Sequence, residues 1–294
     1  ELLSNTYSLK QAGCVALSQA DRPIQNALTL KNALEYVSTQ GIPVMLRCED
    51  TKLKNNGIAH SGPISSRLGL PEIPPSAETT ALARDLILVE ETGVKVHFSQ
   101  ISCARSVEMI LEAKKRGLPV TCDVAIHQLI LSEMDTMSFN SLYRVSPPLR
   151  SMQDKQALLN GVKSGVIDAI VSDHTPLEKD DKLLPYGESA TGISGFETLL
   201  ALVIKLVHEK QLDMMTAIAA VTANPADIIS CKTGCLSAGH SADLSIFDPE
   251  AIWTVDAENL FSEGKNTPFH GWEFVGQVEQ TFFQGRPVFR KNPT

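Results

Sequence analysis

The chain has 294 residues, with 34 acidic side chains against 26 basic ones and a formal net charge of −8 at neutral pH. A nucleic-acid or anionic-membrane partner requires a concentrated basic face, so this balance argues against both. No apolar stretch of the sequence approaches the roughly 18 residues that a membrane span needs, and its first residues show no export signal. We therefore expect a soluble globular chain in the cytoplasm.

Four stretches with apolar residues at helical spacing predict amphipathic helices. They cover residues 27–40, 76–92, 104–116 and 153–163. Each is closed by a glycine, which adopts the left-handed conformation at a helix end more cheaply than other residues. Ser76 is expected to cap the second helix. Nearly continuous apolar runs precede and follow these helices, at residues 13–17, 42–47, 94–98, 118–124 and 166–171.

Continuous apolar runs are typical of parallel strands covered on both faces, and their alternation with helices predicts a parallel α/β fold. A doubly wound sheet and a (β/α)8 barrel of the TIM type both fit this alternation. No phosphate-binding glycine fingerprint follows any of the predicted strands, which favours the barrel.

The pattern changes after about residue 232. Residues 242–248 alternate apolar and polar side chains, and residues 278–289 read as a hairpin that turns at Gln284 and Gly285. The sequence therefore predicts a barrel domain over residues 1–232 and a small C-terminal β-sandwich module over residues 233–294.

Six cysteines stand at positions 14, 48, 103, 122, 231 and 235. Most lie in or beside apolar runs, where a free cysteine behaves as a small hydrophobic residue. Cys231 and Cys235 are four residues apart, but the sequence supplies no second close pair or nearby histidine to complete a zinc site. We expect all six to be reduced thiols.

Polar residues gather where the predicted strands end, and a parallel barrel carries its chemistry at that edge. Four segments have this position: residues 18–23, 47–50, 99–102 and 172–176. Asp173 stands two residues after the apolar run 166–171, a position that suits a metal-binding or proton-transferring carboxylate. A turn or cap role for Asp173 is the alternative. Glu49 and Asp50 are adjacent and face opposite ways, so solvated or capping roles are expected for them.

Several segments resemble the dihydroorotases of the amidohydrolase superfamily. They are RVSPPLR at 144–150, SDHTP at 172–176, GISGFET at 192–198, NPA at 224–226, GKNTPF at 264–269 and GRPV at 285–288. The resemblance begins at the family's fourth barrel strand, so strands 4–8 are expected here and the N-terminal strands are expected to be missing from this sequence. It implies a metal-dependent barrel hydrolase that closes carbamoyl-aspartate to dihydroorotate in pyrimidine biosynthesis.

The same resemblance implies a binuclear zinc site, from which this chain departs. Asp173 is retained at the end of the eighth strand. The ligand positions that end strands four, five and six instead carry Gln19, Arg47 and Gln100. A guanidinium keeps its positive charge and repels a dication, so we expect neither a metal nor another cofactor.

Neighbouring side chains are not expected to replace these ligands. Side chains alternate along a strand, so His97 should face the surrounding helices if Gln100 faces the barrel axis. His174 should likewise point away from Asp173, and Asp21 would reach the site only after a change of register in its loop.

Two functional hypotheses follow. The first is an inactive pseudo-dihydroorotase that serves as a structural partner of the aspartate transcarbamoylase catalytic subunit, with a homodimer as a further assembly. Its basis is a resemblance to the family's non-catalytic branch in GCVALSQA at 13–20, VHFSQ at 96–100 and LYRVSPPLR at 142–150. In this hypothesis an ion pair between Arg47 and Asp173 fills the vacated metal position.

The second hypothesis is an active cyclic amidohydrolase that interconverts carbamoyl-aspartate and dihydroorotate with a reduced zinc site. Asp173 would then act as the catalytic base. Arg144 and Arg150 are candidates for binding the substrate carboxylate, with structural pairing as the alternative for both.

Overall fold

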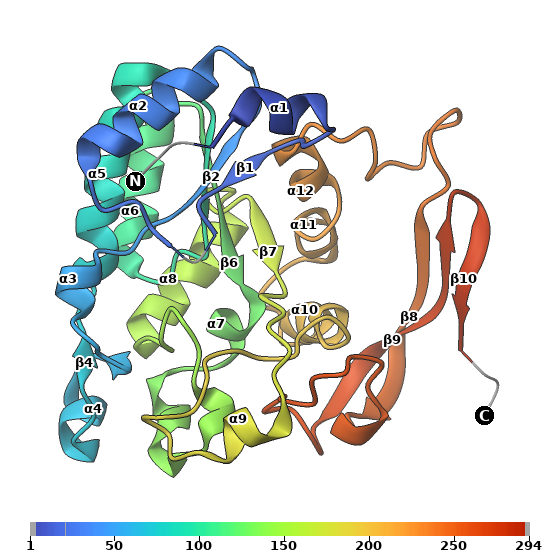
Figure 1. The fold of residues 1–294 in the computed structure, drawn as a ribbon. Helices are drawn as coiled ribbons and strands as arrows, with labels where there is room; N and C mark the ends of the chain where they lie inside the picture. Colours follow the sequence, from blue (N-terminus) through green and yellow to red (C-terminus); the bar gives the residue numbers. More distant parts are fainter. Residues whose placement is uncertain (1–3, 21, 292–294) are drawn as a thin grey trace.

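The computed structural model describes residues 4–20 and 22–291. Across these residues, five strands form a parallel sheet in the order β1-β2-β5-β6-β7 (Figure 1). The strands are β1 (Leu17–Ser18), β2 (Val44–Arg47), β5 (Val96–Ser99), β6 (Val120–Ala125) and β7 (Ala169–Val171). All five lie within or next to the predicted apolar runs, and the parallel arrangement is confirmed.

Five helices supply the main cover of this sheet. They are α2 (Ala27–Ser38), α5 (Ser76–Thr92), α6 (Ala104–Lys115), α8 (Met152–Lys163) and α10 (Leu199–His208). The first four match the predicted helices within two residues at each end. The glycines that follow them have φ values of 65–80°, which confirms the left-handed ends.

The expected serine cap of α5 is wrong. Pro75 occupies the N-cap position and Ser76 is already helical, and neither residue supplies a side-chain cap. The free N–H groups of Ala77 and Glu78 instead bond to the carbonyls of Pro74 and Pro75, at 3.0 Å each. Backbone turns here satisfy the donors that a cap would otherwise take.

Shorter elements fill the connections. They are α1 (Thr6–Gln11), α3 (Thr51–Lys54), β3 (Ala59–His60), α4 (Pro63–Leu68), β4 (Glu72–Ile73), α7 (Ile126–Ile130), α9 (Lys179–Leu183), α11 (Met214–Ala219) and α12 (Ala223–Ile228). Three 3-10 turns cover Glu133–Ser138, Ser141–Tyr143 and Ala257–Asn259. Most of these pieces lie at the edge where the parallel strands end (Figure 1).

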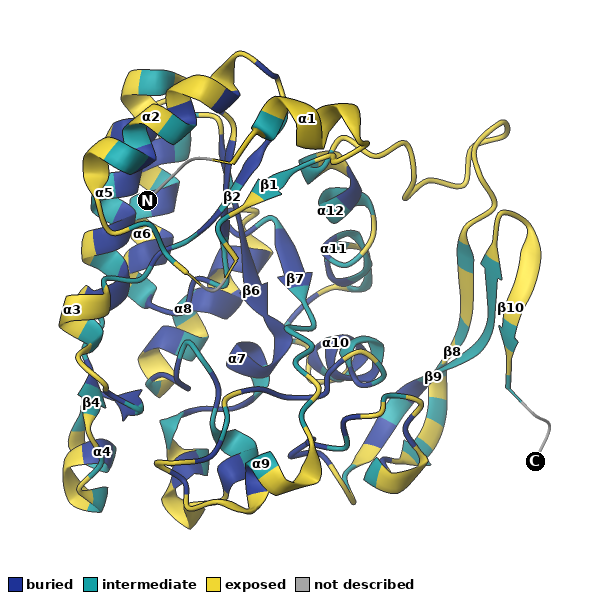
Figure 2. Cartoon of the chain, in the orientation of Figure 1, coloured by how far each residue is buried: buried dark blue, intermediate teal, exposed yellow. Residues whose placement is uncertain are grey.

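The core lies between the sheet and its helices. Leu46, Phe98 and Cys122 are buried on the helix-facing side of their strands, in one apolar cluster with Leu34 of α2 and Ile110 of α6. Figure 2 shows the same layering, with buried residues on the sheet and the inner helix faces and exposed residues outside. The face of the sheet that is turned away from these helices carries more polar side chains, and they lie toward the ends of the strands.

The C-terminal module is an antiparallel sheet, as predicted. Its strands are β8 (Leu244–Thr254), β9 (Glu273–Phe283) and β10 (Arg286–Arg290), in the order β10-β9-β8. Gln284 and Gly285 join the last two with φ values of 50° and 76°, the left-handed pair that a tight hairpin requires. The sheet packs on α10, where the backbone of Gly276 lies against Ile204. The boundary at residue 232 stays a prediction.

All six cysteines are described and none is in a disulfide. Cys48, Cys103 and Cys122 are buried as expected, whereas the other three are exposed. Within the described residues, no helix is both long and apolar enough to cross a bilayer.

Candidate functional site

The polar residues at the ends of β1 and β2 are held by internal hydrogen bonds. The side-chain amide of Gln19 donates to the carbonyl of Arg47 at 2.8 Å and accepts from the N–H of Ile24 at 3.0 Å. Both ends of the Gln19 amide are therefore used to join β1, its own loop and β2. Asp21, in the same loop, lies outside the described residues.

Arg47 ends β2 and reaches a loop that is distant in sequence. Its Nη2 donates to the hydroxyl of Ser146 at 2.8 Å. This bond fixes the 146–148 loop above the strand ends. The proposed ion pair between Arg47 and Asp173 stays a prediction.

Gln100 and Asp173 are in direct contact. The Nε2 of Gln100 donates to Oδ1 of Asp173, which joins the end of β5 to the end of β7. Both residues have left-handed backbones, with φ values of 58° and 47°. That conformation is costly for residues other than glycine, so the surrounding contacts must hold it.

The expected orientation of His97 is wrong. Its Nδ1 lies 2.8 Å from the hydroxyl of Thr121, and its Nε2 lies 2.8 Å from Oδ2 of Asp123. The other oxygen of Asp123 accepts the backbone N–H of Gln100 at 2.7 Å, so His97 and Gln100 are linked on the same side of the sheet. Alternation does not extend to Gln100 because β5 ends at Ser99 and the backbone then turns left-handed.

His127 is a site residue that sequence reasoning missed. It lies in α7, directly after β6, and is only 1% exposed. Its Nε2 is 3.9 Å from Oδ2 of Asp173, and neither ring nitrogen has a hydrogen-bond partner among the described residues. Burial lowers the pKa of His127 to about 4, so the ring is neutral at pH 7. The sequence signal that could have identified His127 as a site residue is its position just after a predicted strand.

The remaining strand-end residues are occupied locally. His174 accepts the N–H of Gly195 at 3.1 Å and stacks on Phe196, with ring centroids 3.8 Å apart. These contacts place its ring away from Asp173, as expected. Asp50 caps α3 by accepting two backbone N–H groups, so the capping role is confirmed for Asp50. Glu49, whose side chain is 18% exposed, pairs with Lys54 at 2.8 Å.

The two candidate substrate arginines lie in different surroundings. Arg150 is 3% exposed and donates to the hydroxyl of Ser102 at 2.9 Å and the carbonyl of Ile73 at 3.2 Å. Its Nη2 is 3.7 Å from the buried carboxylate of Glu78. These contacts favour the structural alternative for Arg150.

Arg144 is half-buried beside the loop that follows Asp173. Its Nη1 donates to the carbonyl of Ser189, and burial lowers its pKa. Lys182 of α9, within the connection that follows Asp173, donates to the carbonyls of Ser141, Arg144 and Ala190, at 2.8–3.2 Å. Arg144 therefore belongs to a set of polar contacts that fix the loop.

The described residues do not fit a binuclear zinc site. No group of three or more His, Cys, Asp or Glu side chains among them is placed to hold a metal ion. One oxygen of Asp173 already accepts the Gln100 amide, and the residue that ends β2, Arg47, is a cation. Zinc needs three or four converging donors, which this part of the chain does not provide.

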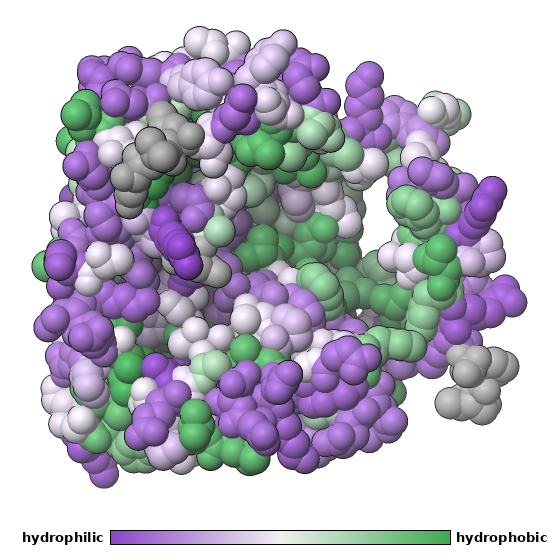
Figure 3. Space-filling view, in the orientation of Figure 1, coloured by the Kyte–Doolittle hydropathy of each residue, from purple (hydrophilic) through white to green (hydrophobic). Residues whose placement is uncertain are grey.

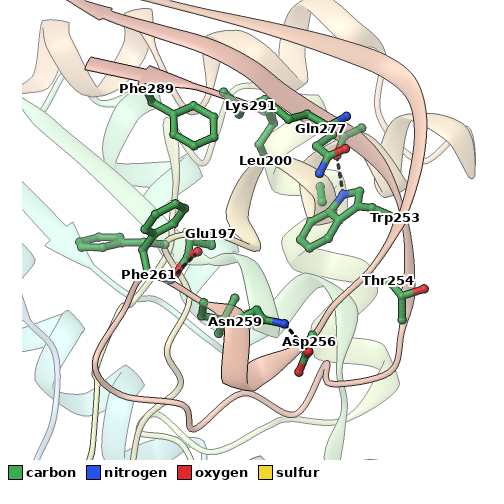
Figure 4. A pocket seen from close by; sticks show the side chains of 15 residues that line it. Glu197, Leu200, Trp253, Thr254, Asp256, Asn259, Phe261, Gln277, Phe289 and Lys291 are labelled. Atoms are coloured by element: carbon green, nitrogen blue, oxygen red, sulfur yellow. Dashed lines mark hydrogen bonds between the residues drawn. The ribbon is translucent and has the colours of Figure 1, made fainter. Parts of the chain in front are cut away.

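Away from the strand ends, a groove of about 560 Å³ lies between α10 and the C-terminal sheet (Figure 4). Its lining is largely apolar and includes Leu200, Trp253 and Phe289. The carboxylate of Glu197 accepts the backbone N–H groups of Phe261 and Ser262, which leaves it structural. Figure 3 shows apolar residues gathered where the surface is hollowed beside this sheet. The groove offers apolar contact, and the polar chemistry stays at the strand ends.

Comparison with protein families finds that the model of the amidohydrolase family matches residues 5–288. The chain is 44% identical over 285 residues to a dihydroorotase-like protein of Pseudomonas aeruginosa, covering 97% of this chain and 67% of that protein. It is 40% identical over 292 residues to a dihydroorotase of Syntrophus aciditrophicus, covering 99% of this chain and 68% of that protein. The chain thus spans about two thirds of the length of these relatives.

Solved structures give the same fold. An L-hydantoinase (dihydropyrimidinase) of Arthrobacter aurescens superposes with a TM-score of 0.86 at 23% identity, covering 98% of this chain and 67% of that chain. A D-hydantoinase of a Thermus species gives a TM-score of 0.80 at 21% identity, covering 94% and 63%. The predicted parallel sheet of TIM-barrel type with a C-terminal antiparallel module is confirmed.

Proposed function

The chain belongs to the amidohydrolase family, and from that premise we propose that it is an inactive pseudo-dihydroorotase of pyrimidine biosynthesis. Its work in this proposal is structural, as a partner of the aspartate transcarbamoylase catalytic subunit. Its relatives support a dihydroorotase-like amidohydrolase. The loss of activity and the partnership are what we propose beyond that.

The observation that carries the proposal is the contact between Gln100 and Asp173. An amide nitrogen lies where the family pattern has a metal ligand, and it uses one oxygen of the retained carboxylate as its acceptor. Gln19 and Arg47 are also engaged with neighbouring loops. Each of the three substituted side chains therefore bonds to the protein, which supports the proposed loss of the metal site.

The chemistry of amide hydrolysis supports the same reading. A metal supplies both a hydroxide near neutral pH and an electrophile that polarises the carbonyl. Asp173 offers a base at most, and the neutral ring of His127 beside it is too deeply buried to reach a substrate. The support for the partner is the resemblance of residues 13–20, 96–100 and 142–150 to the non-catalytic branch.

One observation favours the alternative, an active cyclic amidohydrolase with a reduced metal site. Asp173 and His127 face each other at 3.9 Å, and both residue types bind zinc. Two side chains are fewer than a stable zinc site uses, so the inactive reading is preferred.

The test combines three measurements on the protein purified without chelator. We expect less than one zinc per chain, and no dihydroorotate formed from carbamoyl-aspartate above the rate of an Asp173→Ala control. We also expect co-elution with the aspartate transcarbamoylase catalytic subunit of the same organism in size-exclusion chromatography. Zinc near two per chain together with turnover that the control lacks overturns the inactivity. Clean separation of the two proteins at micromolar concentration overturns the partnership.

A further inference from the structure

We propose that His97 and Asp123 are positioning residues that hold Gln100 against Asp173, forming a hydrogen-bonded brace across β5, β6 and β7. The brace is the series of contacts from His97 through Asp123 and Gln100 to Asp173. This inference rests on the proposed function because it concerns the same strand ends, and it assigns a role to two residues outside the substituted ligand positions.

The first contact of the brace joins two buried side chains. His97 is 3% exposed and Asp123 is 5% exposed, and Nε2 of the histidine is 2.8 Å from Oδ2 of the aspartate. A carboxylate only accepts hydrogen bonds, so Nε2 of His97 carries the hydrogen. In the neutral ring Nδ1 then accepts from the hydroxyl of Thr121 at 2.8 Å, so the orientation of the ring is fixed at both nitrogens.

The second contact fixes the backbone of Gln100. Oδ1 of Asp123 accepts the Gln100 N–H at 2.7 Å, where the φ value of 58° is unfavourable for a residue with a side chain. A hydrogen bond to a charged acceptor is stronger than one between neutral groups, so it offsets part of this strain. Because His97 holds the other oxygen of Asp123, the carboxylate cannot rotate away from Gln100.

The third contact joins the side chain of Gln100 to Asp173. With its backbone left-handed, Gln100 directs its amide across to β7 and donates to Oδ1 of Asp173. Asp173 itself has a left-handed backbone, with φ of 47°, so its carboxylate is held in an otherwise uncommon place. The brace thereby keeps one oxygen of the retained carboxylate occupied.

Hydrogen exchange of the Gln100 side-chain amide, followed by NMR on the deuterated full chain, tests the brace. Asp123→Ala should speed exchange of this amide at least tenfold, because its backbone support is lost. Asp123→Asn should restore slow exchange: its oxygen accepts the Gln100 N–H, and its amide donates to Nε2 of His97 in the other ring tautomer.

Asp154→Ala is the matched control. Asp154 is also buried, also accepts a backbone N–H at 2.8 Å, from Ala104, and also lies near a histidine, with Nε2 of His60 at 4.0 Å. We expect this variant to lose stability while exchange of the Gln100 side-chain amide stays slow. Equal acceleration in Asp123→Ala and Asp154→Ala, or none in Asp123→Ala, overturns the brace.

Asp173→Ala keeps the test decisive if Asp123→Ala does not fold. Removing the last acceptor should speed exchange of the Gln100 side-chain amide while its backbone N–H, held by Asp123, stays protected. Loss of backbone protection in this variant overturns the proposed order of dependence. These readouts are independent of dihydroorotate turnover, so failure of the brace and failure of the proposed function are distinguishable.

Discussion

Replacing Arg150 by alanine should destabilise the fold strongly. Arg150 is 3% exposed and joins the loop before α8 to α5 and to the end of β5. Its guanidinium donates to Ser102 and to the carbonyl of Ile73, and it lies 3.7 Å from the carboxylate of Glu78, which is 4% exposed. The substitution therefore leaves a buried carboxylate without its only cation among the contacts described for it.

The magnitude follows from the burial of both charges. Removing one partner of a buried ion pair costs about 3–5 kcal/mol, because the other charge stays desolvated. Glu78 still accepts from the N–H groups of Ser102 and Cys103, at 2.9 Å and 3.1 Å, which places the expected cost near the lower end, about 3 kcal/mol. For a chain of this size that corresponds to a fall in Tm of roughly 6–12 °C.

Urea unfolding followed by circular dichroism measures this cost. Arg150→Ala is compared with Glu78→Gln and with the double variant, which removes both charges. We expect the double variant to be more stable than the sum of the two single losses predicts, with a coupling of about 1 kcal/mol or more. Arg105→Ala is the control, since the pair of Arg105 with Glu108 is exposed and should contribute less than about 1 kcal/mol.

A free energy of unfolding for Arg150→Ala that lies within about 0.5 kcal/mol of the value for the parent protein would refute the structural role. If the same variant also lost binding of dihydroorotate, the candidate role in substrate binding would replace it. Additive single losses would instead show that Glu78 and Arg150 do not interact.

Two further predictions concern His127 and the C-terminal sheet. The pKa of His127 is about 4 in the fold against 6.5 when unfolded, so its contribution is present above pH 6.5 and is lost as pH falls toward 4. Urea unfolding of the parent protein should therefore show a loss of unfolding free energy on the order of 3 kcal/mol as the pH falls over this range, and His127→Gln should lack this loss. Parallel pH profiles for the two proteins would contradict the assignment. Gly276→Ala places a Cβ 3.0 Å from Ile204 and should cost about 1–3 kcal/mol. Gly285→Ala is also at positive φ, but its Cβ would meet only Cβ of Ala242 at 3.9 Å, an ordinary contact, so it should cost about 1 kcal/mol. Equal midpoints for the two glycine variants would show that α10 does not constrain the sheet.

Much of the fold was predictable because its signals are local. Helical periodicity, the glycines after each helix and the apolar runs between them predict the parallel strand–helix units, and the turn at Gln284 and Gly285 predicts the last hairpin. Each signal depends on a few consecutive residues whose own conformational preferences decide the outcome. The cap of α5 failed because Pro74 and Pro75 supply a backbone alternative that the serine pattern does not reveal.

The site was only partly predictable. The sequence placed Gln19, Arg47, Gln100 and Asp173 at strand ends, and their side-chain types already argued against a zinc centre. It misjudged His97, because the alternation of a strand holds only while the strand continues and β5 ends before Gln100. It passed over His127, whose importance depends on a packing distance to a residue on another strand.

By itself, then, the order of residues determined which segments become strands and helices, and which side-chain types stand at the open edge of the sheet. The tertiary structure alone decided that Gln100 bonds to Asp173, that Asp123 supports Gln100 and that Arg150 is buried with Glu78. Those contacts join residues 23–73 positions apart, and hydrogen bonds act over about 3 Å, so chain folding must first bring the partners together.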